Sequence, residues 1–168
     1  MIFLTVGTQL PFDRMTSAVD AWCAETGQGA SVFGQIGHLA PDSYRPKHFE
    51  WVEMVDPPTF DKHIREASAI VSHAGMGSII TAMSSGTPIV IFPRRGHLGE
   101  QRNDHQFATV QWFADKPGIF AAGDETALPA VLNRVMGGDA MTGGGISPFA
   151  SKELIDALRG FIHEGEAG

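Results

Sequence analysis

Short apolar segments alternate along the chain with longer segments in which apolar and polar residues recur at helical spacing. Six of the short segments predict β-strands, because they are rich in β-branched and aromatic residues. They cover residues 2–6, 31–36, 51–55, 69–72, 88–92 and 118–121. Several are apolar on both faces, which is typical of a parallel sheet buried between helices. The alternation therefore predicts an α/β fold, an open parallel sheet with helices on both faces and right-handed crossovers.

Helices are predicted where apolar residues recur every three or four positions. Three such segments precede residue 136, and the first ends near Gly27. Their apolar positions are Phe12, Met15, Val19 and Trp22; Phe107, Val110 and Phe113; and Leu128, Val131, Leu132 and Val135. Residues 37–48 hold two prolines and no apolar period, which predicts a loop.

The C-terminal part of the chain has a different composition. Residues 137–150 are rich in glycine, which predicts a flexible connection. A final helix is predicted over residues 151–163, with Ser151 as its N-cap and an apolar stripe of Leu154, Ile155, Leu158 and Ile162. We therefore divide the chain into a main domain of residues 1–136, the connection at 137–150, and a C-terminal helix and tail at 151–168.

Composition excludes several classes of protein. A chain of 168 residues with 43% hydrophobic and 18% charged residues is typical of one globular domain, not of a disordered chain, a coiled coil or a collagen. The single cysteine, Cys23, excludes a disulfide framework and a multi-cysteine metal site. No apolar run is long enough to span a membrane, and the N-terminus lacks the basic region of a signal peptide, so we expect a cytoplasmic location.

The net charge of −7 disfavours a protein that binds nucleic acid through its phosphates. One local exception is a basic segment that holds Arg94, Arg95, His97 and Arg102. Its charges are consistent with a solvated loop, offset by Glu100 and Asp104, or with a ligand-binding loop.

The segment around residues 72–78 is the most informative for function. A buried strand ends at Ser72, a turn with two glycines follows, and a helix begins near Ser78. Ligands of open α/β sheets bind beyond the carboxyl ends of the strands, where a helix N-terminus favours an anion. Gly75 and Gly77 allow close approach of a ligand to the backbone, and His73 and Ser78 add donors. The two glycines, taken by themselves, would also be explained by an ordinary strand-to-helix turn.

Three known loop motifs do not fit this segment. A P-loop requires Gly-Lys-Ser/Thr, and no lysine lies between Lys62 and Lys116. A dinucleotide-binding fingerprint requires a third glycine, where this chain has Ile80. A nucleophile elbow requires Gly-x-Ser-x-Gly, which is absent.

Two further polar segments follow predicted strands and should reach the same edge of the sheet. The first strand leads into Gly7, Thr8 and Gln9, although a capped helix start would also explain these residues. The fifth strand leads into the basic segment, where Asp104, His105 and Gln106 are candidates to hold a sugar or a diphosphate. The histidine and aspartate spacing here matches no strong metal template, so no metal site is expected.

Together these segments resemble the C-terminal domain of family 28 glycosyltransferases. The matching motifs are residues 6–14 (Val-Gly-Thr-Gln-Leu-Pro-Phe-Asp-Arg), 72–78 (Ser-His-Ala-Gly-Met-Gly-Ser), 86–90 (Gly-Thr-Pro-Ile-Val) with Pro93, and 103–106 (Asn-Asp-His-Gln). They occur in the family's order and extend over roughly residues 1–122. The chain is most similar to small free-standing members. Examples are the catalytic subunit of the two-subunit transferase that adds the second N-acetylglucosamine to dolichol diphosphate, and bacterial PssE-like exopolysaccharide subunits.

The resemblance implies a Rossmann-like half of a GT-B glycosyltransferase, with a UDP-sugar as donor and no metal or other cofactor. It implies that residues near Met54 and Val55 face the uracil. The residues implied to contact the donor diphosphate are Gly7, Thr8, Gln9, His73, Gly75, Met76, Gly77 and Ser78. Those implied to lie near the sugar are Asp104, His105 and Gln106, and Arg94 or Arg95 could pair with the carboxylate of a uronic acid.

Two features depart from the family or from a complete enzyme. Members commonly carry a glutamate five residues before the glycine of Gly-x-Pro, where it binds the ribose hydroxyls, and this chain has Thr81 there. An inverting transferase also requires a base for the acceptor hydroxyl. We expect a membrane-associated partner subunit to bring the lipid-linked acceptor and the base, with His38 as the internal candidate. The chain would then work at the inner face of a membrane.

These observations predict a glycosyltransferase subunit that transfers a hexose or hexuronic acid to a lipid-diphosphate-linked acceptor in exopolysaccharide or glycan assembly. A non-catalytic module that binds a nucleotide sugar, with Thr81 as a sign of lost activity, is the alternative. A Rossmann-type oxidoreductase is disfavoured because its fingerprint is absent.

Overall fold

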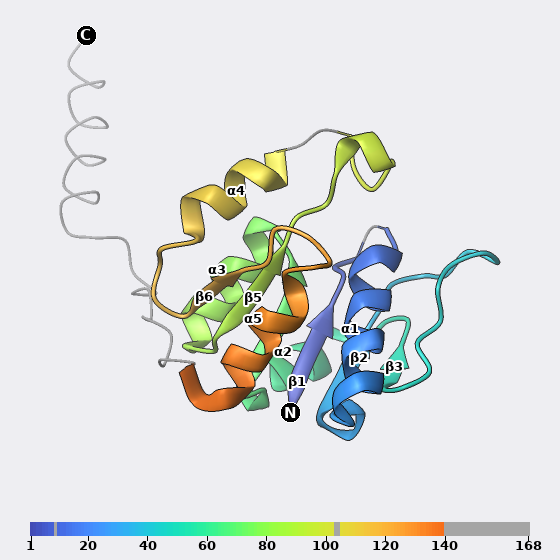
Figure 1. Ribbon diagram of the computed structural model, residues 1–168, viewed down its shortest axis with the longest axis horizontal. Helices are drawn as coiled ribbons and strands as arrows, with labels where there is room; N and C mark the ends of the chain where they lie inside the picture. The colour runs from blue at the N-terminus through green and yellow to red at the C-terminus, as the bar shows by residue number, and fades with distance from the viewer. Residues whose placement is uncertain (9, 103–104, 140–168) are drawn as a thin grey trace, which may run out of the picture.

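The structure of the protein is a computed structural model that describes residues 1–8, 10–102 and 105–139. Six parallel strands form one sheet in the order β3-β2-β1-β4-β5-β6 (Figure 1). Their bounds are β1 Ile2–Thr5, β2 Val32–Gln35, β3 Glu50–Val52, β4 Ala69–His73, β5 Ile89–Phe92 and β6 Ile119–Ala121. All six predicted strands are confirmed, as is the open parallel sheet.

The order of the strands creates a crevice. From β1 the chain builds β2 and β3 on one side of the sheet, and it then crosses over to build β4, β5 and β6 on the other side. Loops that leave β1 and β4 therefore turn to opposite faces, and they leave a gap beyond the carboxyl ends of these two strands. The sequence places glycine in the turns after both of these strands: Gly7 after β1, and Gly75 and Gly77 after β4.

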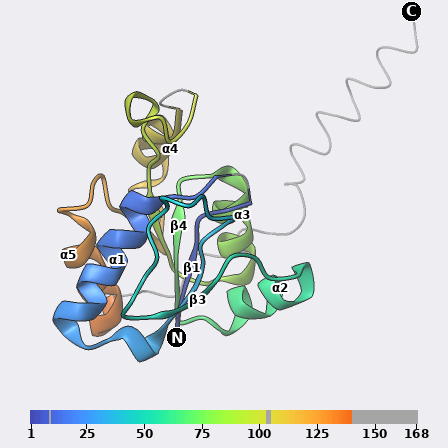
Figure 2. The ribbon, with the colours of Figure 1, turned by 90° about the vertical axis from the view of Figure 1, so that its right-hand side faces the viewer.

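Helices cover both faces of the sheet (Figures 1 and 2). On one face, α1 (Asp13–Thr26) and α5 (Leu128–Arg134) pack with apolar residues of the sheet into a core that includes Leu4, Trp22 and Leu132. On the other face lies a second core, to which α2, α3 and α4 contribute Ile64, Ile79 and Val110. The bounds of these three helices are Pro57–Glu66, Met76–Ser85 and His105–Phe113.

The helix α2 is not among the predicted helices. Its start has a clear local signal, because Asp56 Oδ1 accepts a hydrogen bond from the Thr59 N–H at 2.8 Å and two prolines occupy the first helical positions. Its apolar stripe is thin, since Ile64 is its only buried residue. The predicted end of α1 at Gly27 is confirmed, and this glycine has a φ of 70° in the left-handed region.

Residues 37–48 form a loop, as predicted, and a buried carboxylate holds the loop against α1. Asp20 is 1% exposed. It accepts hydrogen bonds from the Tyr44 hydroxyl at 2.7 Å and from the backbone N–H groups of Lys47 and His48 at 3.0 and 2.7 Å. The buried carboxylate is thereby satisfied, as a buried charge must be.

The predicted C-terminal helix at 151–163 and all of the connection beyond residue 139 lie outside the described residues. Within the described ranges, no helix has the length and apolar character required to cross a bilayer.

Candidate functional site

The strands β1, β2 and β4 carry polar residues in register near their carboxyl ends. Thr5 pairs with Gln35 on one side and with Ser72 on the other, and all three residues are at most 1% exposed. Two of these side chains accept hydrogen bonds from backbone N–H groups that follow β1 and β3. Thr5 Oγ1 accepts from the Gly7 N–H at 3.2 Å, and Gln35 Oε1 accepts from the Val55 N–H at 3.1 Å.

A hollow of about 500 Å³ lies beyond this polar row, at the edge of the sheet where the sequence predicts a ligand site. The structure brings eleven of the predicted site residues into its lining. They are Gly7, Thr8, His73, Gly75, Met76, Gly77, Ser78, Thr81, Arg94, His105 and Gln106. Sequence reasoning missed other lining residues, among them Thr5, Gln35, Phe60, Glu100 and Gln101.

Other predicted site residues lie elsewhere. His38 does not line the hollow, and its Nδ1 lies 3.0 Å from Glu53 Oε2 at an exposed position. Met54 and Val55 are also outside the lining, although Val55 contacts it through Gln35. Gln9 and Asp104 lie outside the described residues.

The His73 imidazole is held between two glycines. A Cβ atom on Gly7 would lie 2.7 Å from His73 Cε1, and one on Gly75 would overlap His73 Nε2. Gly7 also has a φ of 86°, which disfavours any other residue. Burial lowers the pKa of His73 to about 4, and the nearby charge of Arg94 acts in the same direction. The imidazole is therefore neutral at pH 7, so it binds a ligand as a neutral hydrogen-bonding group.

The lowered pKa of His73 predicts that acid destabilises the fold. The unfolded chain binds a proton at this residue below the ordinary pKa of 6.5, whereas the folded chain does so only near pH 4. Stability from this group is complete above pH 6.5 and falls as the pH drops from 6.5 to 4. We expect the melting temperature of the wild type to fall more steeply over this range than that of His73→Gln. Melting temperatures from thermal unfolding scans that fall equally with pH in the two proteins would contradict this expectation.

The N-terminus of α3 opens onto the hollow. Gly75 is its N-cap, with ψ at 137°, and Met76, Gly77 and Ser78 form the first turn. The N–H groups at the start of a helix have no partner inside the helix, and the helix dipole favours an anion there. No atom lies within 4 Å of the position that a Cβ of Gly77 would take, so a ligand can approach the backbone closely. This end of α3 has the properties of a phosphate-binding site.

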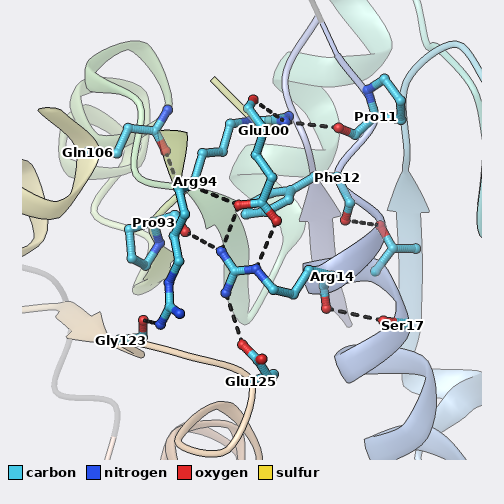
Figure 3. Close-up of polar contacts among 12 residues, drawn as sticks. Pro11, Phe12, Arg14, Ser17, Pro93, Arg94, Glu100, Gln106, Gly123 and Glu125 are labelled. Atoms are coloured by element: carbon cyan, nitrogen blue, oxygen red, sulfur yellow. Dashed lines mark hydrogen bonds and ion pairs between the residues drawn. The ribbon is translucent and has the colours of Figure 1, made fainter. Parts of the chain in front are cut away.

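Arg94 lines the hollow, and its two terminal guanidinium nitrogens donate to backbone carbonyl oxygens of the protein. The residue is 5% exposed, and its guanidinium donates to the carbonyl oxygens of Val6 and Leu10 at 2.9 and 2.7 Å. It also donates to the Pro11 carbonyl at 2.9 Å (Figure 3). It also lies 4.4 Å from the centre of the Phe12 ring. These contacts disfavour the hypothesis that Arg94 pairs with a uronic acid, which stays a prediction. Its donors hold the loop after β1 in place.

Glu100 fastens the loop after β5 to α1. Its two carboxylate oxygens accept from Nε and Nη2 of Arg14, each at 2.8 Å, and one of them also accepts from the Arg95 N–H at 2.8 Å (Figure 3). Arg14 in turn donates to the Pro93 carbonyl at 2.7 Å and to Glu125 at 3.0 Å. Arg94 thus holds the loop after β1, and the pair of Arg14 and Glu100 holds the loop after β5. Both carboxylate oxygens of Glu100 are bonded to groups of the protein.

The predicted sugar residues lie at the end of the hollow formed by α4. Gln106 is 3% exposed and is held at both ends, since its Oε1 accepts from the Arg94 N–H at 3.0 Å and its Nε2 donates to Gln101 Oε1 at 2.7 Å. Gln101 Nε2 lies 3.3 Å from His105 Nε2. Arg95 does not line the hollow, and its Nη2 donates to the Gly123 carbonyl at 3.3 Å. Within the described residues, no group of three or more His, Cys, Asp or Glu side chains is placed to hold a metal ion.

The family model described as the glycosyltransferase family 28 C-terminal domain matches residues 1–118. The chain belongs to this family. The match includes β1 to β5 and, with them, all of the residues that line the hollow. No protein with a curated description matches the chain.

Solved structures of glycosyltransferases share the fold of this family 28 domain. MurG of Acinetobacter baumannii has a TM-score of 0.65 at 17% identity, over 95% of this chain and 49% of MurG. The NMR structure of ALG13 has a TM-score of 0.59 at 17% identity, over 94% of this chain and 93% of ALG13. The glycosyltransferase of kitacinnamycin has a TM-score of 0.56 at 22% identity, over 83% of this chain and 35% of that protein. The chain thus spans between a third and a half of the larger transferases.

Thr81 lies in the lining of the hollow, one turn along α3 from Gly77. Its hydroxyl donates to the Gly77 carbonyl at 2.8 Å, which leaves its oxygen as an acceptor. A threonine at this position can accept one hydrogen bond from a ribose, whereas a carboxylate can accept from both hydroxyls of a diol.

Proposed function

We propose that this family 28 domain binds a UDP-sugar in the hollow and serves as the donor half of a GT-B glycosyltransferase. It would transfer a hexose to a lipid-diphosphate-linked acceptor in exopolysaccharide or glycan assembly. The observation that carries the proposal is the open N-terminus of α3, which lies beside a neutral His73 at the switch point of the sheet. A diphosphate fits there because it is the only strongly anionic part of such a donor.

The arrangement suits the departure of UDP. When the bond between the sugar and the diphosphate breaks, negative charge develops on the diphosphate oxygens. The N–H groups of α3 and its dipole would stabilise that charge, and they are already oriented before the reaction begins. A neutral His73 can donate a hydrogen bond to the same oxygens without a proton being transferred.

We propose that a second, membrane-associated chain supplies the other half of the enzyme. This chain matches 93% of the length of ALG13 but only 49% of MurG and 35% of the kitacinnamycin enzyme. In the GT-B fold the acceptor lies between two domains, so the acceptor and the catalytic base would come with the partner. His38 is a poor candidate for the base because it does not line the hollow.

The function is tested by transfer of labelled sugar from UDP-hexoses into lipid diphosphates in membranes of the native host, with the purified chain added. We expect incorporation that depends on the chain and is lost with His73→Ala. Incorporation that is equal with and without the chain would contradict the proposal. UDP binding without transfer, in membranes that contain the partner, would favour a non-catalytic nucleotide-sugar-binding module.

The burial of Arg94 predicts a neutral sugar on the donor. Its guanidinium is committed to carbonyl oxygens, and Arg95 does not line the hollow. We therefore expect UDP-glucose to displace a labelled UDP probe at least as well as UDP-glucuronate in a direct competition. Clear preference for the glucuronate would contradict this interpretation and favour the hexuronic acid donor.

Replacement of Thr81 by glutamate should strengthen nucleotide binding. A carboxylate at this position could accept hydrogen bonds from both ribose hydroxyls, and we expect UDP to bind about tenfold more tightly, which corresponds to about 1.4 kcal/mol. Calorimetry with UDP and with 2′-deoxy-UDP checks the cause, because the gain should disappear for the deoxy nucleotide. An unchanged affinity for UDP in Thr81→Glu would show that the ribose does not lie beside α3.

A further inference from the structure

Gln35 has a side-chain amide whose orientation is fixed by the protein. The residue ends β2, is 1% exposed and lines the hollow. One end of its amide lies 3.1 Å from the Val55 nitrogen. Because a backbone N–H can only donate, the atom that faces Val55 is the oxygen Oε1, and Nε2 points the other way.

The other end of this amide opens onto the hollow. In the described part of the chain, Nε2 of Gln35 has no hydrogen-bond acceptor. No fully buried side-chain nitrogen or oxygen of the same residues lacks a partner. Nε2 is therefore accessible, and the hollow is the space that Gln35 lines. Because Oε1 is bonded to the protein and Nε2 is not, the Gln35 amide can donate a hydrogen bond to a ligand in the hollow.

The hollow has two chemically different ends. In the sheet, β2 and β5 lie on opposite sides of the central pair β1 and β4. The end at β2 has the half-buried ring of Phe60 and the Gln35 amide, whereas the end beyond β5 has Gln101, His105 and Gln106. A flat base suits the aromatic end with its single fixed donor. The hydroxyl groups of a sugar suit the end with several polar side chains.

We propose that Gln35 selects the base of the donor nucleotide by donating a hydrogen bond from Nε2 to a carbonyl oxygen of a keto pyrimidine. The inference rests on the proposed function and adds a residue that determines specificity. Uracil and thymine carry a carbonyl oxygen at position 4, where cytosine carries an amino group. The amino group of cytosine and Nε2 of Gln35 are both donors, so no hydrogen bond can form between them. The site would therefore reject cytosine nucleotides.

The test compares UDP with CDP, which differ only in the base. Gln35→Glu keeps an acceptor for the Val55 N–H but replaces the donor by an acceptor. We expect the wild type to bind UDP about tenfold more tightly than CDP, and Gln35→Glu to lower this ratio by about tenfold. Gln101→Glu introduces the same charge at the other end of the hollow, so it should weaken both nucleotides equally and leave the ratio unchanged.

A second measurement does not depend on the variant being folded. The side-chain amide resonances of Gln35 in the labelled wild-type chain should shift on titration with UDP, and less with CDP. Wild-type binding of UDP with no shift of these resonances would overturn the inference, as would an unchanged ratio in folded Gln35→Glu. If the wild type binds neither nucleotide, the proposed function fails and the inference fails with it.

Discussion

Replacement of Arg94 by lysine is expected to lower the free energy of unfolding by about 3 kcal/mol, because a buried network would lose most of its donors. The guanidinium donates from two nitrogens to the carbonyls of Val6, Leu10 and Pro11. A lysine ammonium is a single point and cannot reach these three oxygens at once. Buried and partly buried carbonyl groups would lose their partner, and the loop after β1 would no longer be fixed. Urea unfolding followed by circular dichroism measures the loss.

Arg95→Lys is the matched control for this variant. Arg95 is the next residue, is partly exposed, and makes one side-chain hydrogen bond of 3.3 Å to the Gly123 carbonyl. Its backbone N–H, which donates to Glu100, is kept in the variant. We expect a change of about 0.5 kcal/mol or less. Equal losses in the two variants would show that the buried position of Arg94 has no special role.

The second large effect is expected at the two glycines of the phosphate-binding turn, which should respond differently. In Gly75→Ala the new methyl group would overlap the His73 imidazole. The ring would have to leave its position between Gly7 and Gly75, so we expect UDP binding to fall by at least about tenfold, with a loss of stability of about 1–3 kcal/mol. Isothermal calorimetry and thermal unfolding together measure both effects.

Substitutions of Gly77 should affect ligand binding and not the stability of the fold. No atom of the protein lies within 4 Å of its Cβ position, so Gly77→Ala should leave stability unchanged or raise it by about 1 kcal/mol, since alanine favours the helix. A larger residue in Gly77→Leu should block a diphosphate at the backbone of α3 and abolish UDP binding while the protein stays folded. Full UDP binding by Gly77→Leu would show that the diphosphate does not bind at the N-terminus of α3.

The fold could be predicted largely from the sequence because its strands are short, apolar and separated by clear turn signals. Runs such as residues 69–72 and 88–92 have no polar face, which in itself indicates a covered parallel sheet. The helix α2 was missed because it buries only Ile64, so it lacks the apolar period on which the prediction depends. Its Asp56-Pro57-Pro58 start was the signal that could have revealed it.

The site was predicted where its chemistry is local in sequence and missed where it depends on distant residues. The glycine turn around His73 carries its pattern within seven residues. Arg14 and Glu100 are separated by 86 positions, and no local signal predicts that they pair. Gln35 could have been found, because a polar residue near the end of an apolar strand resembles Thr5 and Ser72, with which it shares a row. The burial of Arg94 could not be predicted, since a basic segment usually lies in solvent.

Binding of the donor nucleotide in the hollow can be measured by titrating the isotope-labelled chain with UDP, ATP and NAD and following its backbone amide resonances. We expect UDP to be bound in preference to the other two, and the largest shifts to occur at Gly7 and at the first turn of α3, residues 76–78. A preference for ATP or NAD, or UDP-induced shifts that lie away from the carboxyl edge of the sheet, would contradict a UDP site in the hollow.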